Sequence, residues 1–244
     1  MTVSIIRGPT IDAPTPARRT GGLLDVADVR DGIAWLSGSD EFLSWNCSAP
    51  GFTTICVPDD TPAKWFNDPL TMTGVDFVLF LGTQCRPLGG DVGTQADRVY
   101  DLRESHGVEQ AVEQGLLGDG TSLGTATSPT DALAKMEQEL MVQYAGVGII
   151  HVGAAIATVL LSKALIEQVG GKFFTKLGTR VSVGGYTSGA MYGTGDVLIY
   201  RGSKESHESP DRTTNIHHGL AERAYVAFTD CVRLKITAIP LEGA

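Results

Sequence analysis

The chain has 244 residues, a formal net charge of −9, 42% apolar residues, 19% charged residues and 30 glycines. This length suffices for one large domain or two small ones with a hydrophobic core. The acidic balance excludes a domain that binds nucleic acid through overall basicity. Glycine makes up about 12% of the chain, against a usual ~7%, which favours short strands and tight turns over a helical bundle.

The N-terminus and the cysteines give no sign of secretion. Residues 1–10 lack a charged start followed by a long apolar run, so we expect no signal peptide. The four cysteines are too sparse for a disulfide scaffold and contain no Cys-x-x-Cys pair, so we expect buried free thiols. They are Cys47, Cys56, Cys85 and Cys231.

The N-terminal 22 residues are rich in proline, threonine and arginine and show neither a helical nor an alternating pattern. This composition predicts an arm without regular structure of its own. The arm is basic although the rest of the chain is acidic, because Arg7, Arg18 and Arg19 are opposed only by Asp12.

A strand-rich region follows the arm. Residues 32–57 carry apolar residues interrupted by glycine and proline, residues 58–69 form a polar loop, and residues 75–82 predict a short apolar strand. The clusters Trp35/Trp45 and Trp65/Phe66 could stack a ligand, but packing in a core or an interface is the favoured interpretation.

A long helix is predicted over 95–117, about 35 Å in length at 1.5 Å per residue. Its charged residues, from Asp97 to Glu113, are expected to form a solvated face. Its expected apolar face comprises Val99, Leu102, Val108, Ala111, Val112 and Leu116.

Helices and strands alternate in the next part of the chain. A helix is predicted from Ser128, a suitable N-cap, with Pro129 in the first helical position. A strand over 147–152 and a helix over 154–168 follow, the latter stopped by two glycines. The uncharged stretch 144–162 approaches the length of a membrane span, but its glycines and polar residues favour a buried strand and helix, and we expect no membrane association. Short strands are predicted over 172–175, 180–183 and 196–201, with a glycine-rich loop over 184–195.

The C-terminal region has the clearest pattern. Residues 203–219 are polar, and from Ala224 the even positions are apolar except for Asp230. This alternation predicts a single strand of about sixteen residues, roughly 50 Å long at 3.3 Å per residue. A long helix beside a very long strand indicates an elongated α+β protein.

Motifs of the common catalytic and nucleotide-binding sites are absent. The adjacent His217 and His218 would point to opposite faces of an extended segment, which is unsuitable for a shared metal ion. His151 lies in an apolar strand and is interpreted as a hydrogen-bonded core residue. We therefore predict that the chain is not an enzyme and has no catalytic residues, no metal and no cofactor.

Four stretches, taken in order, resemble the major capsid proteins of tailed bacteriophages, especially those of phages that infect actinobacteria, which have the Hong Kong 97-type fold shared by encapsulin shells. The stretches are FVLFLGTQC at 77–85, VEQAVE at 108–113, the segment from GIIH at 148–151 to LGT at 177–179, and the segment from MYGTG at 191–195 to AERAYVAFTDC at 221–231.

The resemblance implies an N-terminal arm at 1–30 and an extended hairpin, the E-loop, within 31–75. It further implies a peripheral domain at 76–144 and 206–244, with a spine helix at about 94–117, and an axial domain at 145–205. The function implied is a major capsid protein that assembles with itself into hexamers and pentamers. These hexamers and pentamers would form the icosahedral head of the virion around double-stranded DNA, and assembly would take place in the host cytoplasm. Scaffold, portal or decoration proteins would be further partners.

The resemblance also suggests site residues. Arg7, Arg18 and Arg19 are candidates for non-specific contacts with DNA phosphates on the inner surface. The candidate E-loop interface consists of Trp35, Trp45, Lys64 and Trp65, and the candidate axial loop contains Tyr186, Met191 and Tyr192. Two alternatives stay open: an encapsulin-type shell or another phage structural protein of the decoration or tail class, and an α/β enzyme of an unrecognised type.

Overall fold

The computed structural model describes residues 17, 19–31, 41–44, 46, 70–85 and 91–241. Its elements are α1 (Leu23–Val26), β1 (Asp28–Asp31), β2 (Glu41–Ser44), β3 (Leu70–Thr73), β4 (Val75–Cys85), α2 (Val92–Val112), the π-helix η1 (Glu113–Leu117), β5 (Thr121–Ser122), α3 (Pro129–Gln143), β6 (Ile149–Gly153), α4 (Ala154–Ser162), β7 (Ile166–Val169), β8 (Lys172–Thr175), β9 (Arg180–Gly184), β10 (Met191–Thr194), β11 (Val197–Arg201), β12 (Glu205–Asp211), β13 (Ile216–Thr229) and β14 (Arg233–Ile236). The fold is α+β, as the sequence predicts.

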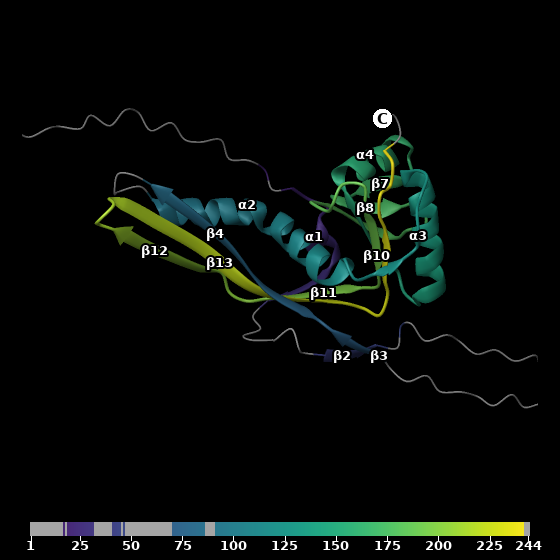
Figure 1. Ribbon diagram of the computed structural model, residues 1–244, viewed down its shortest axis with the longest axis horizontal. Helices are drawn as coiled ribbons and strands as arrows, with labels where there is room; N and C mark the ends of the chain where they lie inside the picture. The colour runs from purple at the N-terminus through teal and green to yellow at the C-terminus, as the bar shows by residue number, and fades with distance from the viewer. Residues whose placement is uncertain are drawn as a thin grey trace, which may run out of the picture.

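Two parts are visible in Figure 1: an elongated one in which α2 lies along β4 and β13, and a more compact one that contains α3 and α4. The sheet of the elongated part has the order β1-β11-β13-β12, and β4 also pairs with β13. The sheet of the compact part has the order β5-β14-β10-β6-β9-β8-β7. The strands β2 and β3 form a separate hairpin-like pair.

β4 and β13 form the long axis of the elongated part. They pair antiparallel from His217 opposite Cys85 to Ala227 opposite Val75. The burial of β4 alternates along its whole length, because α2 covers one face of the sheet and leaves the other open. Leu79 and Leu81 on the covered face pack against residues of α2.

The predicted long helix is confirmed, and its predicted apolar face is confirmed only in part, since Val108, Val112 and Leu116 are buried. α2 begins at Val92, where the side chain of Asp91 accepts a hydrogen bond from the Thr94 backbone N–H at 3.1 Å. Val99 is 38% exposed. The buried stripe recurs every four residues and comprises Val92, Ala96, Tyr100, Glu104, Val108 and Val112. A glutamate within this stripe obscures the hydrophobic pattern of the sequence.

The helix predicted from Ser128 is confirmed. The Ser128 hydroxyl accepts a hydrogen bond from the Asp131 backbone N–H at 3.2 Å, and Pro129 occupies the first position of α3. One face of α3 and one face of α4 bury the core of the compact part against its sheet. None of the helices in the described residues has both the length and the apolar character that crossing a membrane requires.

The helix predicted over 154–168 is too long. α4 ends at Ser162, Ala164 has a φ of 54°, and the chain continues as β7. Gly170 and Gly171, with φ of 59° and 82°, form the turn between β7 and β8 instead of ending a helix. The apolar pattern of residues 165–169 suits either structure, and pairing with β8 decides for a strand.

One predicted loop and one polar segment contain strands. The glycine-rich segment 184–195 includes β10, which lies between β14 and β6 in the interior of its sheet. The polar segment 203–219 includes β12 and the beginning of β13. β12 is an edge strand whose residues are nearly all exposed, so it has no apolar face that the sequence could reveal.

The single C-terminal strand of the prediction is two strands in different sheets. β13 ends at Thr229 and β14 begins at Arg233. Asp230, between them, is 5% exposed and accepts hydrogen bonds from Asn46 Nδ2 at 2.6 Å and the Tyr144 hydroxyl at 3.0 Å. The residue that interrupts the apolar alternation therefore marks the passage from one sheet to the other.

The cysteines differ in state. Cys85 is free, whereas Cys231, directly after Asp230, is disulfide-bonded. The expectation of free thiols is therefore wrong for Cys231.

Candidate functional site

Three buried glutamates lie on the side of α2 and η1 that faces the rest of the protein. Glu104, Glu109 and Glu113 are 6%, 2% and 9% exposed. The prediction that they belong to a solvated helix face is therefore wrong. Burying a carboxylate requires hydrogen-bond donors or cations around it, and each of the three receives them from segments distant in the sequence.

Glu104 binds the first sheet. Its Oε1 accepts hydrogen bonds from Arg223 Nη1 at 2.7 Å and from the Tyr225 hydroxyl at 2.7 Å. Since Tyr225 donates to Glu104, its hydroxyl oxygen accepts from the Tyr100 hydroxyl at 2.8 Å. Burial raises the pKa of Tyr100 to about 12 and also raises the pKa of Tyr225. Both phenols therefore remain neutral donors near pH 7.

Arg201 extends this cluster to β1. Its guanidinium contacts Asp31 through two nitrogens, and its Nη1 lies 3.4 Å from Glu104 Oε1. The hydrogen bond from Arg201 lowers the pKa of the Asp31 carboxyl. Because Asp31 is 67% exposed, this outer pair contributes little to stability, and Glu104 with Arg223 is the stronger part of the cluster.

We expect Tyr225→Phe to lower the free energy of unfolding by about 1–2 kcal/mol, because it leaves the buried Tyr100 hydroxyl without an acceptor and removes one donor from Glu104. Urea unfolding of the dissociated subunit measures the effect. Tyr200→Phe, which changes a hydroxyl on the neighbouring strand β11, is the matched control and should shift stability by less. Equal losses in the two variants would contradict the role of the cluster.

Glu109 joins α2 to two segments that are distant in sequence. Its Oε1 accepts hydrogen bonds from the Leu23 backbone N–H and the Ser105 hydroxyl, each at 3.2 Å. Its Oε2 accepts from the Gly185 backbone N–H at 2.7 Å. A Cβ on Gly184 would lie 2.4 Å from Glu109 Cδ, so glycine is required for the connection to approach the carboxylate this closely.

Glu113, one turn further along, holds the same connection. Its two oxygens accept hydrogen bonds from the Thr187 backbone N–H at 2.9 and 3.1 Å, and Oε1 accepts from the Tyr192 hydroxyl at 2.7 Å. Burial is the main cause of the raised pKa of Tyr192. Glu109 and Glu113 together fix the connection between β9 and β10 of the second sheet onto the long helix of the first part.

His151 lies in the interior beside this connection and is fully buried. The Ser182 hydroxyl lies 2.7 Å from the Tyr186 hydroxyl, and the Tyr186 hydroxyl lies 3.2 Å from His151 Nδ1. The other ring nitrogen, His151 Nε2, lies 2.9 Å from Thr194 Oγ1. Thr194 Oγ1 donates to the Gly195 carbonyl, so it accepts from Nε2–H, and Nδ1 accepts from Tyr186. Burial lowers the pKa of His151 to about 3. It is a neutral core residue, as the sequence predicts.

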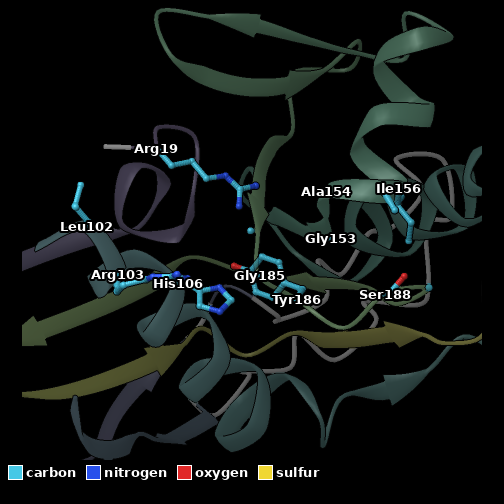
Figure 2. A pocket seen from close by; sticks show the side chains of 13 residues that line it. Arg19, Leu102, Arg103, His106, Gly153, Ala154, Ile156, Gly185, Tyr186 and Ser188 are labelled. Carbon is cyan, nitrogen blue, oxygen red and sulfur yellow. The ribbon is translucent and has the colours of Figure 1, made fainter. Parts of the chain in front are cut away.

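A pocket of about 570 Å³ lies where α2, the β9–β10 connection and the beginning of α4 meet. Figure 2 shows Arg19 on one side of it, Arg103 and His106 from α2 on another, and Tyr186 and Ser188 from the connection. Arg19 donates from Nη2 to the Val183 carbonyl at 3.0 Å, which holds its guanidinium at the rim. The pocket is therefore lined by cationic side chains.

One group in the described residues could offer three metal ligands: Glu205, His207 and Glu222, whose ligand atoms lie within 4.8 Å of one another. All three side chains are on β12 and β13, and those of Glu205 and His207 are 63% and 58% exposed. Exposed carboxylates gather in this way without a metal, so we assign no metal site to them.

The candidate site residues from the sequence have different outcomes. Arg7, Arg18 and the proposed E-loop interface of Trp35, Trp45, Lys64 and Trp65 lie outside the described residues. Arg19 lies at the pocket. The prediction of an axial loop is wrong for Met191 and Tyr192, which belong to β10 and are 0% and 6% exposed. Tyr186 lies in the connection but is also buried, at 5%.

Comparison with solved structures relates the whole chain to viral shells. It matches a chain of the bacteriophage PhiM1 mature capsid with a TM-score of 0.51 and 11% identity, covering 100% of this chain and 93% of that one. A chain from Mycobacterium phage Che8 gives 0.60 and 13%, covering 96% and 97%. The SrpI encapsulin of Synechococcus elongatus gives 0.54 and 9%, covering 95% and 92%. No family model and no curated protein sequence matches. The protein therefore has the Hong Kong 97-type fold of phage capsid proteins, as the resemblance in its sequence implies.

Proposed function

We propose that this protein is the major capsid protein of a tailed bacteriophage, a virion component that assembles with itself into hexamers and pentamers of an icosahedral head. The observation that carries the proposal is the likeness to chains of phage structures over 95–100% of its length, with 93–100% of those chains covered. The buried carboxylates Glu104, Glu109 and Glu113 are engaged in hydrogen bonds that hold the fold together, which agrees with a structural role.

An apolar row on the open face of the first sheet supports self-assembly. Phe80 and Val78 of β4 are 68% and 58% exposed, on the face opposite α2. Their direct partners on β13 are Glu222 and Ala224. Exposed aromatic and branched side chains on a sheet face are typical of surfaces that another protein covers. In the proposed shell, neighbouring subunits cover this row.

The parts of the fold receive roles within the same proposal. The elongated part with α2 would be the peripheral domain with its spine helix, and the compact part the axial domain. β11 lies within 145–205 but belongs to the first sheet, whereas α3 and β14 lie outside 145–205 but pack with the second sheet. The boundary between the elongated and the compact part therefore differs from that of the axial domain expected at 145–205. Residues 1–30 and 31–75 remain candidates for the arm and the E-loop.

The proposed partners are further copies of the chain and packaged double-stranded DNA, which the basic arm would contact through phosphates, with scaffold, portal or decoration proteins as additional ones. Assembly in the host cytoplasm belongs to the same proposal. One structural neighbour, the SrpI encapsulin, favours a second candidate, an encapsulin-type shell.

Electron microscopy of the purified full chain tests the proposal. We expect closed icosahedral particles. A monomer or small oligomer that forms no particles at any concentration would overturn the shell. Co-purification with a portal protein and DNA from infected cells separates a phage head from an encapsulin-type compartment, which would instead enclose a protein cargo.

Phe80→Asp should reduce particle formation at least ten-fold while changing the free energy of unfolding of the subunit by no more than about 0.5 kcal/mol, because the side chain is exposed within one subunit and would be desolvated in a shell. Sedimentation measures assembly and urea unfolding measures stability. Gln84→Asp adds the same charge to the same exposed face of β4 and controls for charge. Normal particles from Phe80→Asp would contradict the proposed interface.

A further inference from the structure

We propose that the pocket between α2, the β9–β10 connection and α4 binds a phosphate group. Its lining combines Arg19, Arg103 and His106 with the polar Ser188 and the beginning of α4. Guanidinium groups are suited to phosphate oxygens because their N–H groups donate in a planar fork. Two of them converge on one cavity in a chain whose net charge is −9.

The two basic side chains on the α2 side, Arg103 and His106, have no side-chain partner within the described part of the chain. Among the described residues, neither Arg103 nor His106 takes part in a hydrogen bond or an ion pair. Arg19 uses only Nη2, for the Val183 carbonyl, which leaves its other N–H groups free to donate. By contrast, Arg30, Arg180, Arg201 and Arg223 of the described chain all pair with carboxylates.

Among the described residues, the nearby carboxylates form no ion pair with the arginines of this pocket. Glu109 and Glu113 lie on the same helix as Arg103 and His106, but their oxygens are occupied by backbone N–H groups and hydroxyls. The His106 ring lies against the backbone of Gly185, which places it over the connection that the two glutamates hold. Arg103 and His106 are thus kept beside the pocket without a carboxylate paired to them among the described residues.

The first turn of α4 adds to the positive electrostatic potential in the pocket. Gly153, Ala154 and Ala155 line the pocket, the N-cap Gly153 provides no side-chain acceptor, and the first turn contains no acidic residue. Unpaired N–H groups at the start of a helix favour an anion. The N–H groups at the start of α4 and the two arginines together match the charge of a phosphate better than the charge of a single carboxylate.

The phosphate could come from inorganic phosphate or from the backbone of DNA, and only the second source rests on the proposed function. Inorganic phosphate is titrated into the full chain at pH 8 and constant ionic strength, with binding followed by calorimetry. Arg103→Gln is the test variant, and Arg212→Gln, which removes an exposed arginine from the turn after β12, is the matched control. We expect saturable binding to the wild type and to Arg212→Gln, and binding at least ten-fold weaker to Arg103→Gln.

Three results would overturn the site: no binding to the wild type, equal binding to all three proteins, or displacement of phosphate by acetate at equal concentration. A short DNA duplex then distinguishes the sources. If it competes with phosphate in the wild type, the site takes backbone phosphates, and if it does not, the site is one for the free anion. Particle formation is scored separately, so a failure of the shell proposal does not decide the outcome at the pocket.

Discussion

Replacing Glu109 with alanine is expected to lower the free energy of unfolding by about 3–5 kcal/mol, because it leaves two buried backbone N–H groups without acceptors and opens a cavity. These donors belong to Leu23 and Gly185, which lie in the segment before β1 and in the β9–β10 connection. The loss therefore affects the junction between the two parts of the fold. Urea unfolding of the dissociated subunit measures it.

Two further variants show whether the hydrogen bonds of Glu109 cause the effect. Glu109→Gln keeps the shape and one acceptor oxygen and should lose about 1–2 kcal/mol. Asp119→Asn changes the same charge at an exposed position and should stay within about 0.5 kcal/mol. In hydrogen exchange, the amides of Leu23 and Gly185 should lose protection first in Glu109→Ala. Unchanged protection at these amides would refute the proposed junction.

Acid should destabilise the subunit through His151. Burial lowers its pKa from 6.5 to about 3, so the unfolded chain binds a proton that the folded one does not between these values. Stability is complete above pH 6.5 and falls as the pH decreases, by about 1.4 kcal/mol per pH unit and up to about 5 kcal/mol near pH 3. Urea unfolding at a series of pH values measures the slope.

The contribution of His151 is separated from that of the carboxylates by removing its titration. His151→Gln should be less stable than the wild type at pH 7. Between pH 6.5 and 4, however, the slope of its free energy of unfolding against pH should correspond to the uptake of about one proton fewer on unfolding than in the wild type. His218→Gln removes an exposed histidine and should leave the slope unchanged. If both variants keep the wild-type slope, the buried neutral state of His151 is wrong.

Some elements are determined by local sequence. The start of α3 follows from Ser128 and Pro129, whose capping chemistry acts within four residues. The apolar run over 75–82 predicted the first part of β4, although the strand continues to Cys85. The role of His151 as a core residue follows from its position within an apolar strand.

Other elements depend on partners that are distant in the sequence. Residues 166–169 become β7 because β8 pairs with them, and residues 191–194 become a strand because β6 and β14 lie on either side. The long C-terminal alternation could not reveal that Asp230 marks a change of sheet. In each case the local pattern was compatible with two structures, and the long-range pairing selected one.

The candidate site was the part that the sequence predicted least well. Glu104, Glu109 and Glu113 have the composition of a solvated helix face, and only their closeness to the stripe of Val108 and Val112 hinted at burial. Their donors, such as Gly185 and Arg223, lie 76 and 119 positions away from Glu109 and Glu104.

The sequence by itself determined the class of this protein: an acidic, glycine-rich α+β chain with a long helix, a long strand and no catalytic motif, whose ordered motifs resemble those of phage capsid proteins. Helix caps and strand alternation are local, so they can be identified along the chain. The tertiary structure alone decided which charges are buried, where the chain changes sheets and which cations line the pocket. These properties depend on the desolvation of groups by distant segments, and no local pattern records that.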